Sequence, residues 1–213
     1  MTMESLDRTK MHPENQAVQA TKSSFEIPTV SEEMYVKTRE ALVKEGYTFF
    51  VNIESLSIGQ LVADKATSQR FGYVNPSENM RAIVPPQMEV AINPRNLRIL
   101  KSNYKSTDVQ ISMLGEEEAA LKAKLPQEVR NFISIPMQSA SVFAQLDDKY
   151  QKETGKLLFT DWFGRTDTDD QTVVFVGRDS PNGRLDIGGW DGDGGGVFVF
   201  AVPVVVLPRK LAS

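Results

Sequence analysis

The spacing of apolar residues changes twice along the chain, and each change predicts a different kind of secondary structure. Up to about residue 105, short helical and strand-like segments alternate. A first helix is expected to begin at a cap, Thr29 or Ser31, and to end near Gly46. The mostly apolar stretch that follows, Tyr47–Ile53, predicts a buried strand. The further elements expected here are a helix over Ser57–Ala66, a loop over Arg70–Arg81, and strands over Gln87–Ile92 and Leu97–Leu100.

Between Ser106 and Gly155 the apolar residues recur at helical spacing. Proline suits the first turn of a helix and stops a helix that reaches it, so Pro126 and Pro136 divide this stretch. The pattern predicts a helical hairpin or a three-helix segment. Its expected helices run to about Leu125, from Pro126 to Pro136, and over Met137–Lys152.

After Gly155 the period falls to two, which is typical of strands with one buried face. Short, turn-rich joints separate the strands, as in an antiparallel β-meander. The predicted fold class is therefore α+β, with a C-terminal antiparallel meander and the helical segment packed on one face. The four expected strands are Lys156–Phe163, Thr172–Arg178, Arg184–Trp190 and Val197–Leu207.

Two features divide the chain into regions. Residues 1–26 are polar and lack a hydrophobic period, so they are expected to form a disordered or loosely docked leader. Residues 27–213 are expected to form a single α+β domain. The change of period near residues 101–106 marks the one place where that domain could divide.

The composition excludes several kinds of chemistry. The 213 residues include no cysteine, which removes disulfides, thiolate nucleophiles and iron–sulfur clusters. The one histidine, His12, lies in the polar leader, which argues against a Ser-His-Asp triad and a two-histidine zinc site. Any catalysis would rest on carboxylates, Lys, Tyr or a hard cation, and the sequence favours a protein that is not an enzyme.

The formal net charge of −4 argues against a general affinity for nucleic acid or for an anionic membrane surface. The longest apolar run, Val197–Leu207, is too short to span a bilayer and contains Pro203. With no apolar segment typical of a signal peptide near the N-terminus, a cytoplasmic protein is expected.

Aspartate and glycine are concentrated between residues 161 and 196. Asp-Gly and Gly-Gly pairs supply the positive φ of hairpin turns, so turns are the plainer interpretation. Short carboxylates are also ligands for Ca²⁺ and Mg²⁺. An EF-hand loop that begins at Asp191 fails, because Gly195 and Val202 stand where it needs an Asp or Asn and a Glu.

The metal hypothesis depends on how the turns of a meander project. Alternate turns leave the same end of the sheet, so two acidic turns could combine their carboxylates. The combined cluster would bind Ca²⁺ or Mg²⁺ through Asp167, Asp169, Asp191 and Asp193.

A second candidate site is an aromatic platform for a sugar or a peptide. Stacking on an indole, with hydrogen bonds from a carboxylate and a guanidinium, would bind such a ligand. Tryptophans in strands are more often part of the core, which is the alternative. The residues of this candidate ligand site are Asp161, Trp162, Arg165 and Trp190.

Three functional hypotheses follow. The first is a non-enzymatic intracellular binding or assembly module that recognises a protein or a small ligand through the turn-bearing edge of its C-terminal sheet. The second is a hydrolase that uses a divalent cation held by the aspartates, whose bound water replaces the missing histidine base. The third is a structural subunit of a homo-oligomer.

Overall fold

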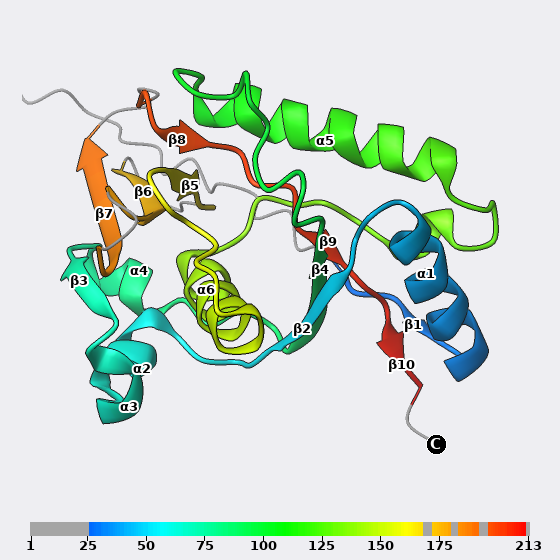
Figure 1. Ribbon diagram of the computed structural model, residues 1–213, viewed down its shortest axis with the longest axis horizontal. Coiled ribbons are helices and arrows are strands. Elements are labelled where there is room, and N and C mark those ends of the chain that lie inside the picture. Colours follow the sequence, from blue (N-terminus) through cyan, green and yellow to red (C-terminus); the bar gives the residue numbers. More distant parts are fainter. Residues whose placement is uncertain (1–25, 168–171, 180–182, 192–195, 212–213) are drawn as a thin grey trace, which may run out of the picture.

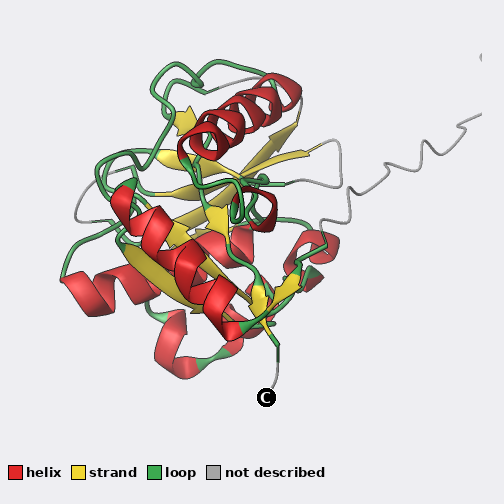
Figure 2. Ribbon diagram, turned by 90° about the vertical axis from the view of Figure 1, so that its right-hand side faces the viewer, coloured by secondary structure: helices red, strands yellow, loops and turns green. Residues whose placement is uncertain are grey.

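Helices and strands alternate along the chain up to β4 (Met88–Ile92), a helical stretch follows, and the last third contains strands. The computed structural model describes residues 26–167, 172–179, 183–191 and 196–211. Its strands form three sheets through the middle of the molecule, and helices pack against them (Figure 1; Figure 2). The predicted α+β fold class is confirmed.

The largest sheet has five strands in the order β3-β7-β6-β5-β8. The meander predicted in the C-terminal part of the chain is its centre, where β5, β6 and β7 pair antiparallel in sequence order. Two parallel strands flank it, β3 beside β7 and β8 beside β5, so the whole sheet is mixed. Its strands are β3 (Phe71–Val74), β5 (Phe163–Arg165), β6 (Thr172–Gly177), β7 (Leu185–Asp191) and β8 (Val199–Phe200).

A smaller sheet has three antiparallel strands in the order β2-β4-β9. Beside it, β1 and β10 form a short parallel pair that joins the beginning and the end of the described chain. These strands are β1 (Thr29–Val30), β2 (Phe49–Ile53), β4 (Met88–Ile92), β9 (Val205–Val206) and β10 (Arg209–Lys210).

Helix α6 lies between the two larger sheets (Figure 1). Its apolar side chains join a core that also contains Val51 and Val90 of the small sheet and Val174 of the large one. On the opposite face of the small sheet, α1 and α5 pack in a second core around Ala91 and Val205. The helices are α1 (Glu32–Lys44), α2 (Ile58–Ala63), α3 (Lys65–Ser68), α4 (Glu78–Ala82), α5 (Thr107–Lys124), α6 (Ala140–Thr154) and the 3₁₀ turn η1 (Arg130–Phe132).

Local signals in the sequence explain where the long helices begin and end. The Ser31 hydroxyl caps α1 by accepting from the Met34 amide at 3.3 Å, as one of the two predicted caps. Gly46 follows that helix with φ of 91°, and Gly155 ends α6 with φ of 70°. Both endings were expected from the sequence.

The stretch between Pro126 and Pro136 differs from expectation. A helix was predicted there, but the chain forms only the 3₁₀ turn η1 and is then extended. Ser134 bridges antiparallel to Val206, so the segment completes the edge of the small sheet instead. The apolar residues Ile133 and Ile135 are buried in this extended form. The spacing of apolar residues alone does not distinguish a short buried extended segment from a buried helix.

Four other segments also differ. Of the expected strand Lys156–Phe163, only Phe163 lies in a strand, β5, and the residues before it form a loop. Val197–Leu207, expected as one strand, divides into β8 and β9, which belong to different sheets and have Pro203 between them. Leu97–Leu100 is a loop, although a strand was expected. Part of the expected loop Arg70–Arg81 is strand β3, because it finds a partner in β7.

Both larger sheets combine strands from the two sides of residues 101–106, since β3 pairs with β7 and β4 pairs with β9. No helix in the described ranges is long and apolar enough to cross a membrane.

Candidate functional site

Two of the four residues of the predicted aromatic platform are buried. Trp162 packs against the rings of Phe159 and Phe200, with ring centroids 4.7 and 6.2 Å away. The guanidinium of Arg165 lies inside the protein, where Nη1 donates to the Thr107 hydroxyl at 2.7 Å and Nη2 to the Lys105 carbonyl at 3.1 Å. These two side chains therefore present no open platform, and their role here is to build the core.

The other two platform residues lie apart from each other. Asp161 is exposed beside Trp162 and accepts from the Thr160 hydroxyl at 3.0 Å. Trp190 lies in β7 opposite Val173, near the other end of the sheet, and its side chain lies outside the described structure. Binding of a ligand by these residues stays a prediction.

The predicted metal ligands fall only partly within the described chain. Asp167 is exposed after β5, and its amide donates to the Gln138 carbonyl at 2.8 Å. Asp191 pairs with Thr172 at one end of the large sheet, while Asp169 and Asp193 lie outside the described residues. Among the residues that are described, no three acidic or histidine side chains lie close enough together to hold a metal ion.

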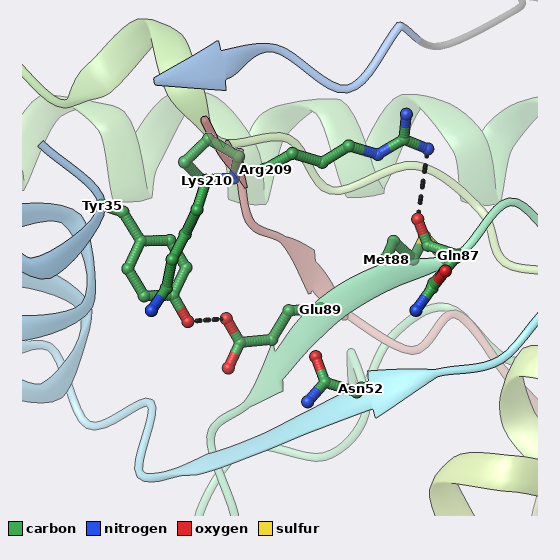
Figure 3. A pocket seen from close by; sticks show the side chains of 8 residues that line it. Tyr35, Asn52, Gln87, Met88, Glu89, Arg209 and Lys210 are labelled. Atoms are coloured by element: carbon green, nitrogen blue, oxygen red, sulfur yellow. Dashed lines mark hydrogen bonds between the residues drawn. The ribbon is translucent and has the colours of Figure 1, made fainter. Parts of the chain in front are cut away.

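A groove that the sequence did not reveal lies between α1, the small sheet and β10 (Figure 3). In the register of the small sheet, Asn52 of β2 stands opposite Glu89 of β4, so both side chains share one face. Helix α1 covers this face near Ala91, while the polar end with Asn52 and Glu89 is left for the groove.

A hydrogen-bonded network of three side chains lies at the groove, and two of them, Tyr35 and Glu89, line it. Tyr35, on the buried side of α1, donates its hydroxyl hydrogen to Glu89 Oε2. Arg39, one turn further along α1, donates to Glu89 Oε1 at 3.0 Å and to the Tyr35 hydroxyl oxygen at 3.1 Å. Its guanidinium also lies 4.2 Å from the centre of the Phe50 ring. Because each group has two partners, the network is rigid and links α1 to the sheet.

The electrostatics of the network keep the phenol neutral. Burial raises the pKa of Tyr35, and the hydrogen bond to Glu89 raises it further. Arg39 opposes this rise through its own hydrogen bond. Tyr35 therefore acts as a hydrogen-bond donor to Glu89 at neutral pH.

Strand β10 supplies two cations to the groove. Lys210 Nζ lies 4.6 Å from the centre of the Tyr35 ring and 3.0 Å from Glu32 Oε1. Arg209 points away from Tyr35, and its Nη2 donates to the Gln87 carbonyl at 3.1 Å (Figure 3). Within the described part of the chain, Arg209 has no carboxylate partner, whereas Lys210 and Arg39 each have one.

The groove has the size of a small-molecule site. Its volume is about 550 Å³, within the range of small-molecule pockets. A second groove of about 610 Å³ lies on the other side of Tyr35 and Lys210, along the outer face of α1. That second groove is less polar and includes Val36, Val43 and Phe50. Together these features can hold a small ligand through the Arg209 guanidinium, which has no carboxylate partner among the described residues, through exposed amides and through a fixed carboxylate.

The sequence contains one weak signal of this site. Glu89 interrupts the apolar run Met88–Ile92, in a strand predicted to be buried, and Asn52 does the same in β2. A charged residue in a buried strand requires a partner. The partners come from α1, and only the folded structure shows the contact.

Comparisons with known proteins add no family to this description. No protein-family model, no curated protein and no solved structure matches the chain.

Proposed function

We propose that this chain is a non-enzymatic binding or assembly module, and that the groove beside β10 binds a small organic anion. From the sequence alone, the binding site was expected at the turn-bearing edge of the C-terminal sheet. Burial of Trp162 and Arg165 there makes the groove the better-supported site. The observation that carries the proposal is Arg209, a cation at the groove without a carboxylate partner among the described residues, beside a rigid polar wall.

The charges around the groove favour an anion. Arg39 is paired with Glu89, and Lys210 is paired with Glu32, so these four charges compensate one another. Arg209 adds one positive charge, and among the described residues its side chain donates to the Gln87 carbonyl, a neutral acceptor. A guanidinium presents two parallel donors, which match the oxygens of a carboxylate or a phosphate.

The same groups are poorly suited to catalysis. A general base or a nucleophile must release or accept a proton near neutral pH. The raised pKa keeps Tyr35 protonated, and both Glu89 oxygens already accept hydrogen bonds. Binding without chemistry is therefore the simpler role of this network.

The test uses two probes, succinate for the carboxylates and glycerol 2-phosphate for the phosphates, at constant ionic strength. One of them is expected to raise the melting temperature of the wild-type protein. A ligand at 100 times its dissociation constant adds about 2.7 kcal/mol, which for a chain of this size means about 5 to 11 °C. Arg209→Ala should abolish the rise, and Arg184→Ala, which removes another exposed arginine, should retain it.

Two results would contradict the proposal. The first is that neither probe stabilises the wild-type protein, and the second is that the two arginine variants lose the stabilisation equally. Backbone amide shifts in NMR spectra of the wild-type protein would locate the bound probe independently, and shifts confined to residues far from β10 would also contradict it.

The cation-dependent hydrolase is a second candidate, because one observation favours its geometry. The register that pairs Thr172 with Asp191 brings the start of β6 and the end of β7 to the same end of the sheet. Asp167 precedes the start of β6 and Asp191 is the last residue of β7, so these two predicted ligands flank that end of the sheet. A structural homo-oligomer is the third hypothesis, and a stable mass above that of one chain in solution would support it.

A further inference from the structure

A second surface, formed by residues that do not line the groove, combines exposed apolar side chains with cations that have no carboxylate partner among the described residues. It is formed by the loop between β4 and α5, green in Figure 1, and by the residues that lead into β8. We call this surface the basic ridge. Its cations are Arg95, Arg98, Lys101 and Lys105, and its exposed apolar side chains are Leu100, Tyr104, Val197 and Phe198.

The two segments of the basic ridge are joined by hydrogen bonds. The Tyr104 amide donates to the Gly196 carbonyl at 3.3 Å, and the Asn103 side chain donates to the Val197 carbonyl at 3.1 Å. The segment that contains Tyr104 therefore lies beside the segment that leads into Phe198, although 94 positions separate these two residues in the chain. They are 61% and 59% exposed.

Buried polar contacts hold the loop in place from below. The Ser102 hydroxyl donates to the Ile99 carbonyl at 2.6 Å and accepts from the Ala201 amide at 2.8 Å. The buried Gln110 side chain of α5 donates to the Ser102 carbonyl at 2.6 Å. The loop is thus fixed before any partner arrives, which reduces the entropy lost on binding.

Tyr104 has an unfavourable backbone conformation. Its φ of 57° makes it the one non-glycine residue with positive φ in the described parts of the chain. A bulky side chain rarely adopts this region, because its Cβ crowds the backbone. Hydrogen bonds from Tyr104 and from its neighbour Asn103 hold the backbone there, and the Tyr104 side chain is left exposed. Strain of this kind concentrates at binding sites.

A hollow lined by residues of the β4–α5 loop gives the basic ridge a concave part. It has a volume of about 280 Å³ and includes Arg95, Arg98, Leu100 and the mostly buried Trp162 in its lining. The Arg98 guanidinium lies 4.7 Å from the centre of the Phe200 ring and 5.4 Å from that of Trp162, so stacking fixes its position. The hollow can accept one side chain of a partner.

The charge of the basic ridge is opposite to that of the chain as a whole. Residues 93–105 contain four cations and no acid, in a chain with a net charge of −4. None of the four forms an ion pair with the described residues, whereas most other arginines and lysines of the core and helices have carboxylate partners. We infer that the basic ridge is a docking surface for an acidic segment of another protein that also carries apolar side chains.

The mixture of side chains favours a protein over a nucleic acid. Leu100, Val197 and Phe198 offer apolar contact area that a phosphate backbone would not use. A protein segment can place acids at the rim and apolar residues at the centre, as stable interfaces do.

The probe is a fluorescein-labelled peptide of 12 residues, in which Asp and Glu surround a central Trp-Leu pair. Fluorescence anisotropy measures its binding to the full-length protein at 50 and 300 mM salt. Binding is expected at low salt and should weaken at least fivefold at high salt. Lys101→Glu with Lys105→Glu should weaken it at least tenfold, and Phe198→Ala at least threefold.

The matched control is Lys65→Glu with Lys156→Glu, which reverses two exposed lysines elsewhere and gives the same net charge. It should change the affinity less than twofold, and all variants should keep the wild-type melting temperature within a few degrees. Equal binding of the peptide to wild-type protein and to the Lys101/Lys105 variant would overturn the inference. So would equal binding of a peptide with Lys in place of every acid.

Two further outcomes would also overturn it by assigning the surface to another occupant. The first is tighter binding of a labelled single-stranded DNA of 12 nucleotides that is lost in the Lys101/Lys105 variant. The second is self-association of the wild-type protein in sedimentation that the same variant abolishes. The groove beside β10 contains none of these residues, so failure here leaves the anion site unaffected, and the reverse also holds.

Discussion

A buried ion pair between α6 and the large sheet gives the strongest prediction about stability. Asp147 and Arg178 form two parallel hydrogen bonds of 2.7 and 2.8 Å, and their side chains are 0% and 3% exposed. Arg178 also donates to the carbonyls of Phe159 and Gly183, at 3.1 and 3.0 Å. The Leu158 amide donates to Asp147 at 3.2 Å, so every strong donor and acceptor of the pair has a partner.

Arg178→Met removes one charge and leaves the other buried. Asp147 would then retain the Leu158 amide and the more distant Arg70, whose Nη2 lies 3.6 Å from its Oδ2. The buried Phe159 carbonyl and the half-buried Gly183 carbonyl would lose their donor at the same time. Loss of one partner of a buried pair costs about 3 to 5 kcal/mol. For a chain of 213 residues this lowers the melting temperature by about 6 to 20 °C.

The assay is urea unfolding of four proteins: wild type, Arg178→Met, Asp147→Leu and the double variant. The double variant is expected to lose less free energy of unfolding than the sum of the two single losses, by about 2 kcal/mol or more, because it leaves no charge unpaired. Lys152→Ala is the control, since it removes an exposed ion pair with Asp148 on the same helix and should change the stability by less than about 0.5 kcal/mol. A loss under about 1 kcal/mol for Arg178→Met, or additive single losses, would refute the reasoning.

Three other predictions concern pH, backbone strain and cations. Burial, with Glu117 and Glu45 nearby, raises the pKa of Tyr47 to about 12. The neutral phenol therefore stabilises the folded state below pH 10, and this stabilisation is lost as the pH rises towards 12. Tyr47→Phe should therefore make the free energy of unfolding fall less steeply above pH 10, by up to about 1.4 kcal/mol per pH unit, and an unchanged slope would contradict this. Tyr104→Gly should be more stable than Tyr104→Ala by about 1 kcal/mol in urea unfolding, since glycine accepts the positive φ, and equal stabilities would show that the backbone is unstrained. After EDTA treatment, millimolar Ca²⁺, Mg²⁺ or Mn²⁺ should leave the melting temperature unchanged; a rise of about 5 to 11 °C that Asp167→Ala with Asp191→Ala removes would favour the hydrolase instead.

Local patterns in the sequence were sufficient to predict those elements whose structure depends on neighbouring residues in the chain. Ser31 and Gly46 mark the ends of α1 because capping and positive φ depend on a few neighbouring residues. The alternation after Gly155 predicted the β5–β6–β7 meander, since each strand pairs with its neighbour in sequence.

Pairings between distant segments could not be predicted in this way. The Phe71–Val74 stretch is a strand only because β7 lies beside it, more than 100 residues later. Ile133 and Ile135 have the apolar character of a helix face, yet the bridge from Ser134 to Val206 holds them extended. Propensity is weak compared with such tertiary contacts, which decide the outcome.

The candidate sites show the same division. Trp162 and Arg165 have the chemistry of a binding platform, but neighbours that are distant in sequence bury both side chains. The groove and the basic ridge were missed because each unites segments more than 50 residues apart, Tyr35 with Glu89 in one and Tyr104 with Phe198 in the other.

By itself, the sequence determined the α+β class, the ends of α1 and the central meander. Its lack of cysteine and its single histidine also determined which kinds of chemistry are excluded. These depend on residue type and on short spacings. Only the tertiary structure decided which side chains are exposed, which charges are paired and which surfaces remain open. Burial and pairing are properties of contacts between distant segments, and those contacts exist only once the chain has folded.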